Sequence, residues 1–133
     1  MNPRYPIIAS RANHRCEYCR APEALFNSPF EVEHIIPPFR GGLEDETNLA
    51  LACRSCNVFK GSHISAFDEQ TNTEERLFNP RTDLWEHHFL FDPESGQIEG
   101  RTSIGRVTVA RLAINESVQV LARRLWAELR VFP

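Results

Sequence analysis

The sequence lacks several features that would assign it to a particular class of protein. It contains no apolar run long enough to cross a membrane, and residues 1–15 lack the hydrophobic stretch of a secretory signal peptide. It also contains no repeat, linker or low-complexity tract. We therefore expect a cytoplasmic protein without a membrane partner, folded as one domain over residues 1–133 around a single core.

Lysine is almost absent, because fourteen of the fifteen basic residues are arginine. The net charge of −3 argues against a nucleic-acid binder, but the charge is unevenly distributed. Residues 1–20 carry +3 and residues 101–133 carry +4, which leaves −10 for the middle of the chain. The planar guanidinium group suits phosphate, although arginines also solvate helix faces. Both interpretations of the basic ends stay open, and salt-dependent binding to DNA would separate them.

The four cysteines form two Cys-x-x-Cys pairs, Cys16 with Cys19 and Cys53 with Cys56. Two such pairs are a strong signature of a structural zinc site. Disulfides are disfavoured in a cytoplasmic protein, and a redox motif needs only one pair. We therefore predict that all four thiolates bind one zinc ion and that zinc binding stabilises the fold.

The segment between the two cysteine pairs predicts a strand, a loop, a second strand and a helix. Apolar and polar residues alternate over residues 30–36, which is typical of a strand, and Pro37 and Pro38 end it. Residues 48–51 suggest a short return strand. Residues 53–60 favour a helix that ends near a glycine.

Four polar residues fall at fixed offsets in this segment: Glu33 and His34 are adjacent, Asn48 lies fourteen residues after the histidine, and Asn57 nine residues later. With the paired cysteines they resemble the HNH endonuclease family, whose site is a ββα-metal finger. The resemblance covers roughly the first half of the chain, residues 1–63. It implies a nuclease whose four-cysteine zinc holds the finger together.

The resemblance also implies a role for each of these residues. His34 would be the general base that activates a water, Glu33 and Asn57 would bind one divalent metal ion, and Asn48 would orient the loop that carries the histidine. A neutral imidazole accepts a proton readily near pH 7, and oxygen ligands favour magnesium or manganese over zinc. Many members have aspartate and histidine at the positions of Glu33 and Asn57. We therefore predict a two-ligand site of modest affinity.

Two basic residues near this site are candidates for contacting a substrate phosphate. Lys60 lies three residues after Asn57 on the predicted helix, and Arg40 lies in the predicted loop. The acidic run at residues 44–46 is either a solvated loop or a second metal site. Acids so close to the site would repel a phosphate.

The second half of the chain predicts a hairpin. Residues 84–91 are apolar and aromatic enough for a strand, and residues 97–100 return after a turn that contains a glycine. His87 and His88 would point to opposite faces of such a strand, so we interpret them as structural residues.

Two helices are predicted after the hairpin, the first over residues 102–114 and the second capped by Asn115. The second helix carries one apolar stripe, made of Val118, Leu121, Leu125 and Leu129. Its arginines Arg123, Arg124 and Arg130 lie off that stripe. They form either a solvent face, a surface that contacts phosphate or an interface with a partner.

These observations together predict an α+β fold. A zinc-stapled ββα-metal finger over residues 1–63 would carry a hairpin and helices over residues 64–133. The expected function is metal-dependent hydrolysis of phosphodiester bonds in nucleic acid, and we expect double-stranded DNA as the substrate. RNA would need the same chemistry. The alternative is a non-catalytic zinc-ribbon module that binds DNA or protein.

Overall fold

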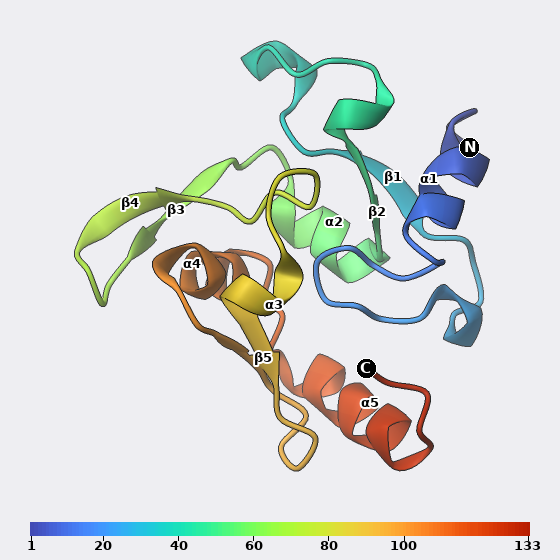
Figure 1. Cartoon of the computed structure of the whole chain (residues 1–133), viewed down its shortest axis with the longest axis vertical. Helices are drawn as coiled ribbons and strands as arrows, with labels where there is room; N and C mark the ends of the chain where they lie inside the picture. Colours follow the sequence, from blue (N-terminus) through green and yellow to red (C-terminus); the bar gives the residue numbers. More distant parts are fainter.

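The first half of the chain folds into a strand, loop, strand and helix in the computed structural model, which describes residues 1–133 (Figure 1). Strand β1 (Glu31–His34) pairs antiparallel with β2 (Leu49–Ala52), with His34 opposite Leu49. Helix α2 (Arg54–Lys60) follows directly and packs against both strands. The predicted order of elements in the finger is confirmed.

The N-terminal helix α1 (Tyr5–Arg11) lies against β2. A proline in its first turn suits a helix start, because the proline N–H would have no partner there. Ile8 is fully buried whereas Ile7 is exposed, so only one of these two residues reaches the core. The chain then passes through the first cysteine pair and the short 3-10 helix η1 (Glu23–Leu25) to β1.

The connection between β1 and β2 stands away from the rest of the molecule, in teal in Figure 1. It contains two short 3-10 helices, η2 (Pro38–Arg40) and η3 (Glu46–Asn48). Gly42 is required at its base, because a Cβ there would clash with the backbone carbonyl of Ile36. The loop is therefore closed tightly where it leaves the strands.

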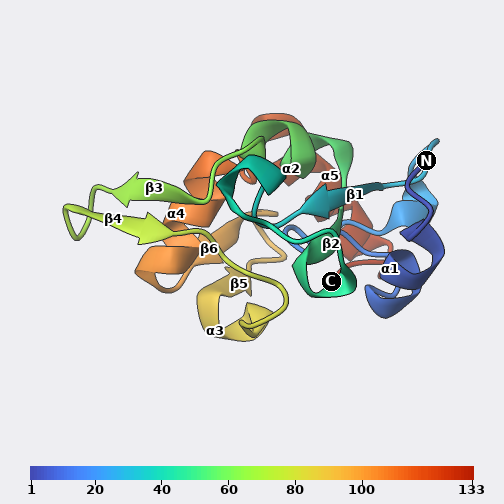
Figure 2. The same cartoon turned by 90° about the horizontal axis from the view of Figure 1, so that it is seen from above.

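In the second half of the chain, most of the short elements pack around helix α4. The hairpin of β3 and β4 projects from one end of the molecule (Figure 2), and α4 packs against it and against β6. The elements are β3 (Ser65–Asp68), β4 (Thr73–Arg76), α3 (Trp85–His88), β5 (Phe89–Phe91), β6 (Ile98–Gly100), α4 (Ser103–Arg111) and α5 (Ser117–Glu128). No helix is long and apolar enough to cross a membrane.

The strand predicted over residues 84–91 is wrong in its first half, where the chain makes the helical turn α3. The indole N–H of Trp85 donates to the backbone carbonyl of Tyr18 at 2.8 Å. Trp85 also packs on Phe89, with ring centroids 5.1 Å apart. Residues four apart share a face on a helix, so the helical turn brings both rings to the same side. Only residues 89–91 form the predicted strand.

One apolar cluster contains residues from both halves of the chain. All four residues of β2 are buried in it. Tyr18 of the finger packs edge-on against Phe78, which in turn packs against Phe89 of β5 at a centroid distance of 5.1 Å. The two halves are thus joined by aromatic contacts.

Helix α5 differs most from its prediction. Arg123 is buried, with 1% of its surface exposed, whereas the whole apolar stripe is exposed: Val118, Leu121, Leu125 and Leu129. The Arg123 guanidinium donates to the backbone carbonyls of Gly96 and Ile114 and to the side chain of Asn115. Burial lowers the pKa of Arg123. The carbonyls of Gly96 and Ile114 would otherwise lack partners, so the arginine and not the stripe faces inward.

Asn115 does not cap α5 as predicted. Its side chain accepts from the backbone N–H of Ile98 at 2.9 Å and donates to the Ile98 carbonyl at 2.8 Å. The N-cap position of α5 is occupied by Glu116. Helix α4 does begin as predicted, because the Thr102 hydroxyl accepts from the Gly105 N–H at 3.0 Å.

Candidate functional site

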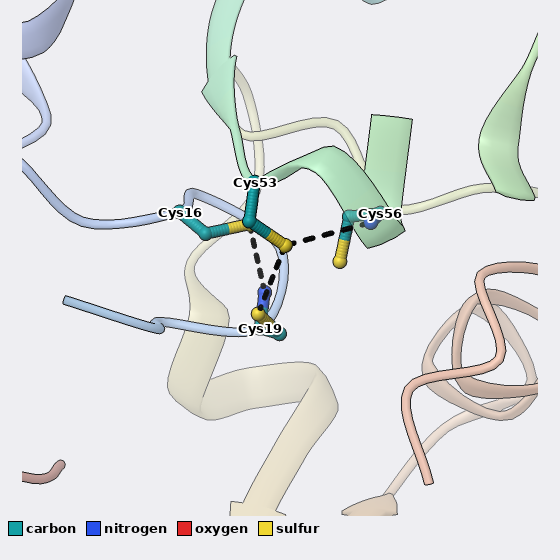
Figure 3. A group of neighbouring side chains, drawn as sticks. All are labelled: Cys16, Cys19, Cys53 and Cys56. Carbon is teal, nitrogen blue, oxygen red and sulfur yellow. Dashed lines mark hydrogen bonds between the residues drawn. The ribbon is translucent and has the colours of Figure 1, made fainter. Parts of the chain in front are cut away.

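The four cysteines converge on one point between the turn after α1 and the start of α2 (Figure 3). Their sulfur atoms all lie within 4.8 Å of one another, and the sulfurs of Cys19 and Cys53 are 3.8 Å apart. A tetrahedral ion with metal–sulfur bonds of about 2.3 Å places its sulfurs roughly 3.8 Å apart. The cluster therefore has the geometry of a four-coordinate metal site.

Each cysteine pair is shaped by the same local contact. The Cys16 sulfur accepts from the Cys19 N–H, and the Cys53 sulfur accepts from the Cys56 N–H, both at 3.5 Å. The cysteine side chains also hydrogen-bond to one another. The side-chain hydrogen bond with Cys16 is the largest cause of the raised pKa of Cys19 and Cys56 and of the lowered pKa of Cys53. Four thiolates this close repel one another, so a bound cation is needed before all four ionise.

Asn48 closes the loop between β1 and β2 at its base. Its side-chain oxygen accepts from the Ile36 N–H at 2.9 Å, and its amide nitrogen donates to the carbonyls of Ile36 and Leu43 at 2.8 and 2.9 Å. The residue is buried. All of these bonds are internal to the loop, so Asn48 determines the loop's shape and does not itself face solvent.

His34 ends β1 beside this loop, with 27% of its side chain exposed. Its Nε2 lies 2.7 Å from a carboxylate oxygen of Glu44. An ionised carboxylate only accepts hydrogen bonds, so Nε2 is the donor in this contact, and Nδ1 makes no hydrogen bond. Glu44 was expected to lie in a solvated acidic loop or a second metal site. Glu44 is exposed, as in a solvated loop, and its carboxylate also contacts His34.

Glu33 is buried and already has a cationic partner. Its carboxylate forms an ion pair with the Lys60 ammonium and accepts the Tyr18 hydroxyl at 2.7 Å. Burial raises the pKa of Glu33, and the Lys60 charge opposes that rise. Lys60 also donates to the backbone carbonyls of His34 and Ile35. The predicted contact of Lys60 with a substrate phosphate is therefore wrong, because its ammonium group is enclosed within the finger.

Asn57 has a different carboxylate as its partner. Its amide nitrogen donates to Glu31 at 2.9 Å, and Arg54 donates to the other oxygen of Glu31 at 2.8 Å. The structure thus pairs Asn57 with Glu31, and Glu33 with Lys60. Glu31 was not among the predicted site residues. Its position two residues before Glu33, on the same face of β1, is the signal that would have found it.

Arg40 lies at the exposed tip of the loop, at the end of η2. Its Nε donates to the Ser62 carbonyl at 3.2 Å, and its guanidinium carbon lies 5.3 Å from the centre of the Phe39 ring. Phe39 is 73% exposed. A guanidinium group and an aromatic ring therefore stand side by side in solvent on the loop that follows His34.

Residues 16–63 match the family model described as HNH endonuclease. This segment belongs to the HNH endonuclease family. The HNH segment contains all four cysteines and the loop and helix described above. Members of this family are generally nucleases that act on nucleic acid.

The comparison with curated proteins extends beyond the HNH segment. The chain is similar to the Septu protein PtuB of Bacillus thuringiensis, with 25% identity over 120 residues. That alignment covers 89% of this chain and 43% of the relative, so the chain spans less than half the length of the relative. No solved structure matches the chain.

Proposed function

We propose that the protein is a metal-dependent endonuclease that hydrolyses phosphodiester bonds in DNA, with His34 as its general base. The observation that supports this most directly is the placement of His34 within the HNH segment. Its imidazole is partly exposed at the end of β1 and has one nitrogen bonded to Glu44 and the other free. A neutral imidazole with a free lone pair can accept a proton from water near neutral pH.

The chemistry assigned to these residues is a single displacement at phosphorus. The Nδ1 atom of His34 takes a proton from a water molecule, whose oxygen forms a bond to phosphorus while the bond to the departing sugar oxygen breaks. The departing oxygen takes a proton from solvent. Asn48 contributes by closing the loop beside the histidine, which keeps the imidazole in place during the reaction.

A divalent ion, magnesium or manganese, would stabilise the charge that develops on the phosphate. The predicted ligands fit such an ion only in part. Asn57 offers an amide oxygen, because its nitrogen is the atom that contacts Glu31. Glu33 is neutralised by Lys60 and would have to exchange that ammonium for the metal ion. Glu33 and Asn57 as a shared ligand pair therefore stay a prediction.

The ion proposed for the four-cysteine cluster is zinc, in a structural role. Zinc favours four thiolates in a tetrahedral arrangement, and a site closed by four protein ligands has no position open for a substrate. The cluster is buried, since all four cysteines are. Cys56 is followed directly by Asn57, so the ion would fix the start of α2 and with it the position of that asparagine.

Substrate contacts are proposed for the tip of the loop. The guanidinium group of Arg40 suits a phosphate, and a ring as exposed as that of Phe39 suits stacking on a base. Neither contact selects DNA over RNA or a duplex over a single strand. Double-stranded DNA is proposed as the substrate.

The test is a plasmid-nicking assay in magnesium, manganese or EDTA with wild type, His34→Ala and His87→Ala. His87 is exposed and lies outside the HNH segment, so it controls for loss of any histidine. We expect wild type and His87→Ala to nick the plasmid only with a divalent ion, and His34→Ala to lose at least about a hundredfold in rate, the scale of a general base. Equal cutting by wild type and His34→Ala would contradict the role of His34. Single-stranded DNA and RNA in parallel reactions test the substrate class.

One observation favours the alternative, a non-catalytic zinc-binding module for DNA or protein. The internal ion pair of Glu33 with Lys60 occupies a residue that the nuclease proposal gives to the metal. That alternative predicts salt-dependent DNA binding without cutting in any metal. The same assay, combined with a binding titration at two salt concentrations, distinguishes the two.

A further inference from the structure

We infer that Glu44 is a positioning residue for His34: its carboxylate holds the imidazole so that Nδ1 faces the reacting water. This inference rests on the proposed function. It starts from the contact between His34 Nε2 and Glu44 at 2.7 Å, in a loop where the sequence suggested either solvated acids or a second metal site.

Both neighbours of Glu44 are fixed by hydrogen bonds. The Leu43 carbonyl accepts from Asn48 at 2.9 Å, and the Asp45 carboxylate accepts from the Thr47 N–H at 2.9 Å, which starts η3. The backbone on each side of Glu44 is therefore held, although the Glu44 side chain is 60% exposed. The loop presents one carboxylate at a set position against the histidine.

The histidine is held from two directions. Lys60 donates to the His34 backbone carbonyl at 3.2 Å, and Glu44 accepts from its ring. A carboxylate on one imidazole nitrogen fixes the tautomer and stabilises the imidazolium that forms when the other nitrogen takes a proton. Glu44 therefore acts on the reaction through His34, without contact to the substrate.

This role also explains why acidic residues can lie close to a site that binds phosphate. The charge of Glu44 faces the imidazole, and Asp45 is bonded to Thr47. The side chain of Glu46, the third acid of the run, makes no hydrogen bond or ion pair, and the residue is exposed. Glu46→Gln is therefore a matched control, because it makes the same change of charge two residues away in the same loop.

The experiment measures kcat and KM for Glu44→Gln, Glu44→Ala and Glu46→Gln, together with the melting temperature of each variant. Glutamine can still accept from Nε2 but carries no charge, whereas alanine does neither. We expect kcat to fall about tenfold for Glu44→Gln and about a hundredfold for Glu44→Ala, with KM and melting temperature nearly unchanged. Glu46→Gln keeps the wild-type kcat.

Wild-type or faster turnover in Glu44→Ala, or equal losses in Glu44→Gln and Glu46→Gln, would overturn the inference. Proton NMR gives a readout that needs no turnover. The ring Nε2 proton of His34 should be visible in wild type, and Glu44→Ala should lose it through exchange with water. A wild type that shows this proton but cuts no nucleic acid would refute the proposed function and leave the contact standing, whereas its absence in wild type would remove the contact itself.

Discussion

The finger and the second half of the chain each bury a charged side chain, Glu33 and Arg123, and the two have different kinds of partner. In the finger, the buried acid Glu33 is matched by a buried base, Lys60, and by the Tyr18 hydroxyl. In the second half, the buried cation Arg123 is matched by the carbonyl oxygens of Gly96 and Ile114 and by the Asn115 side chain, without a carboxylate. Glu33 is thus stabilised as one member of a pair of charges, whereas Arg123 uses its charge mainly to satisfy backbone acceptors.

The two halves also differ in what holds their elements together. The finger between β1 and α2 is short, and its four cysteines bring together the turn after α1 and the start of α2. The second half has no comparable cluster, and its elements pack through aromatic rings such as Phe78 and Phe89. Stability of the finger should therefore depend on a metal ion, whereas that of the second half should depend on packing and on Arg123.

Loss of the metal cluster should have the largest effect. Cys56→Ser should leave the finger unfolded, because zinc binding to four thiolates contributes about 10 kcal/mol or more, as much as a typical domain's whole stability. Ser55→Ala, one residue earlier in α2, is the control and should melt like wild type. For both variants, mass spectrometry measures the metal content and circular dichroism monitors the thermal unfolding. Wild-type melting of Cys56→Ser would mean that the cysteines do not hold the finger together.

The finger was predictable because its signals are local. The alternation over residues 30–36, the prolines that follow it and the helix-favouring run over residues 53–60 predict the order of strand, loop, strand and helix, and the structure has that order. The partners of its polar residues were not predictable in the same way. Glu44 meets His34 only because the loop folds back, and Glu31 meets Asn57 only because α2 packs on β1.

In the second half, the sequence predicted helices α4 and α5 and the return strand β6. It did not predict the helical turn α3, the hairpin of β3 and β4, or which side of α5 faces the core. An apolar stripe predicts which side of α5 faces the core only if nothing else competes for that side. Here Gly96, 27 residues before Arg123, presents a carbonyl that the guanidinium satisfies. Similarly, the helical turn at Trp85 follows from its bond to Tyr18, 67 residues away. Neither partner is visible in the local pattern.

Breaking the ion pair of the finger should have the second-largest effect. Lys60→Met leaves Glu33 buried without its cation, and removal of one partner of a buried pair costs about 3–5 kcal/mol. The double variant Lys60→Met with Glu33→Gln should recover part of that loss, because no buried charge is left unpaired. Urea unfolding of the wild type, both single variants and the double variant gives the coupling energy. If Lys60→Met were as stable as wild type but bound nucleic acid more weakly, that result would instead support the predicted contact of Lys60 with a substrate phosphate.

The smallest of the three effects is expected in α5, where the inverted burial of the helix can be tested on one element. Arg123→Met keeps an apolar stem in place but leaves the carbonyls of Gly96 and Ile114 without a donor, whereas the Asn115 side chain keeps its bond from the Ile98 N–H. An unsatisfied buried acceptor costs about 1–3 kcal/mol, and we expect a total near the upper end of that range. Leu121→Ser, two residues earlier on the exposed stripe, should change the free energy of unfolding by about 0.5 kcal/mol or less. Urea unfolding of both variants measures the contrast. If Leu121→Ser were the more destabilising change, the stripe would face an apolar surface in solution and the burial of Arg123 would not determine how α5 packs.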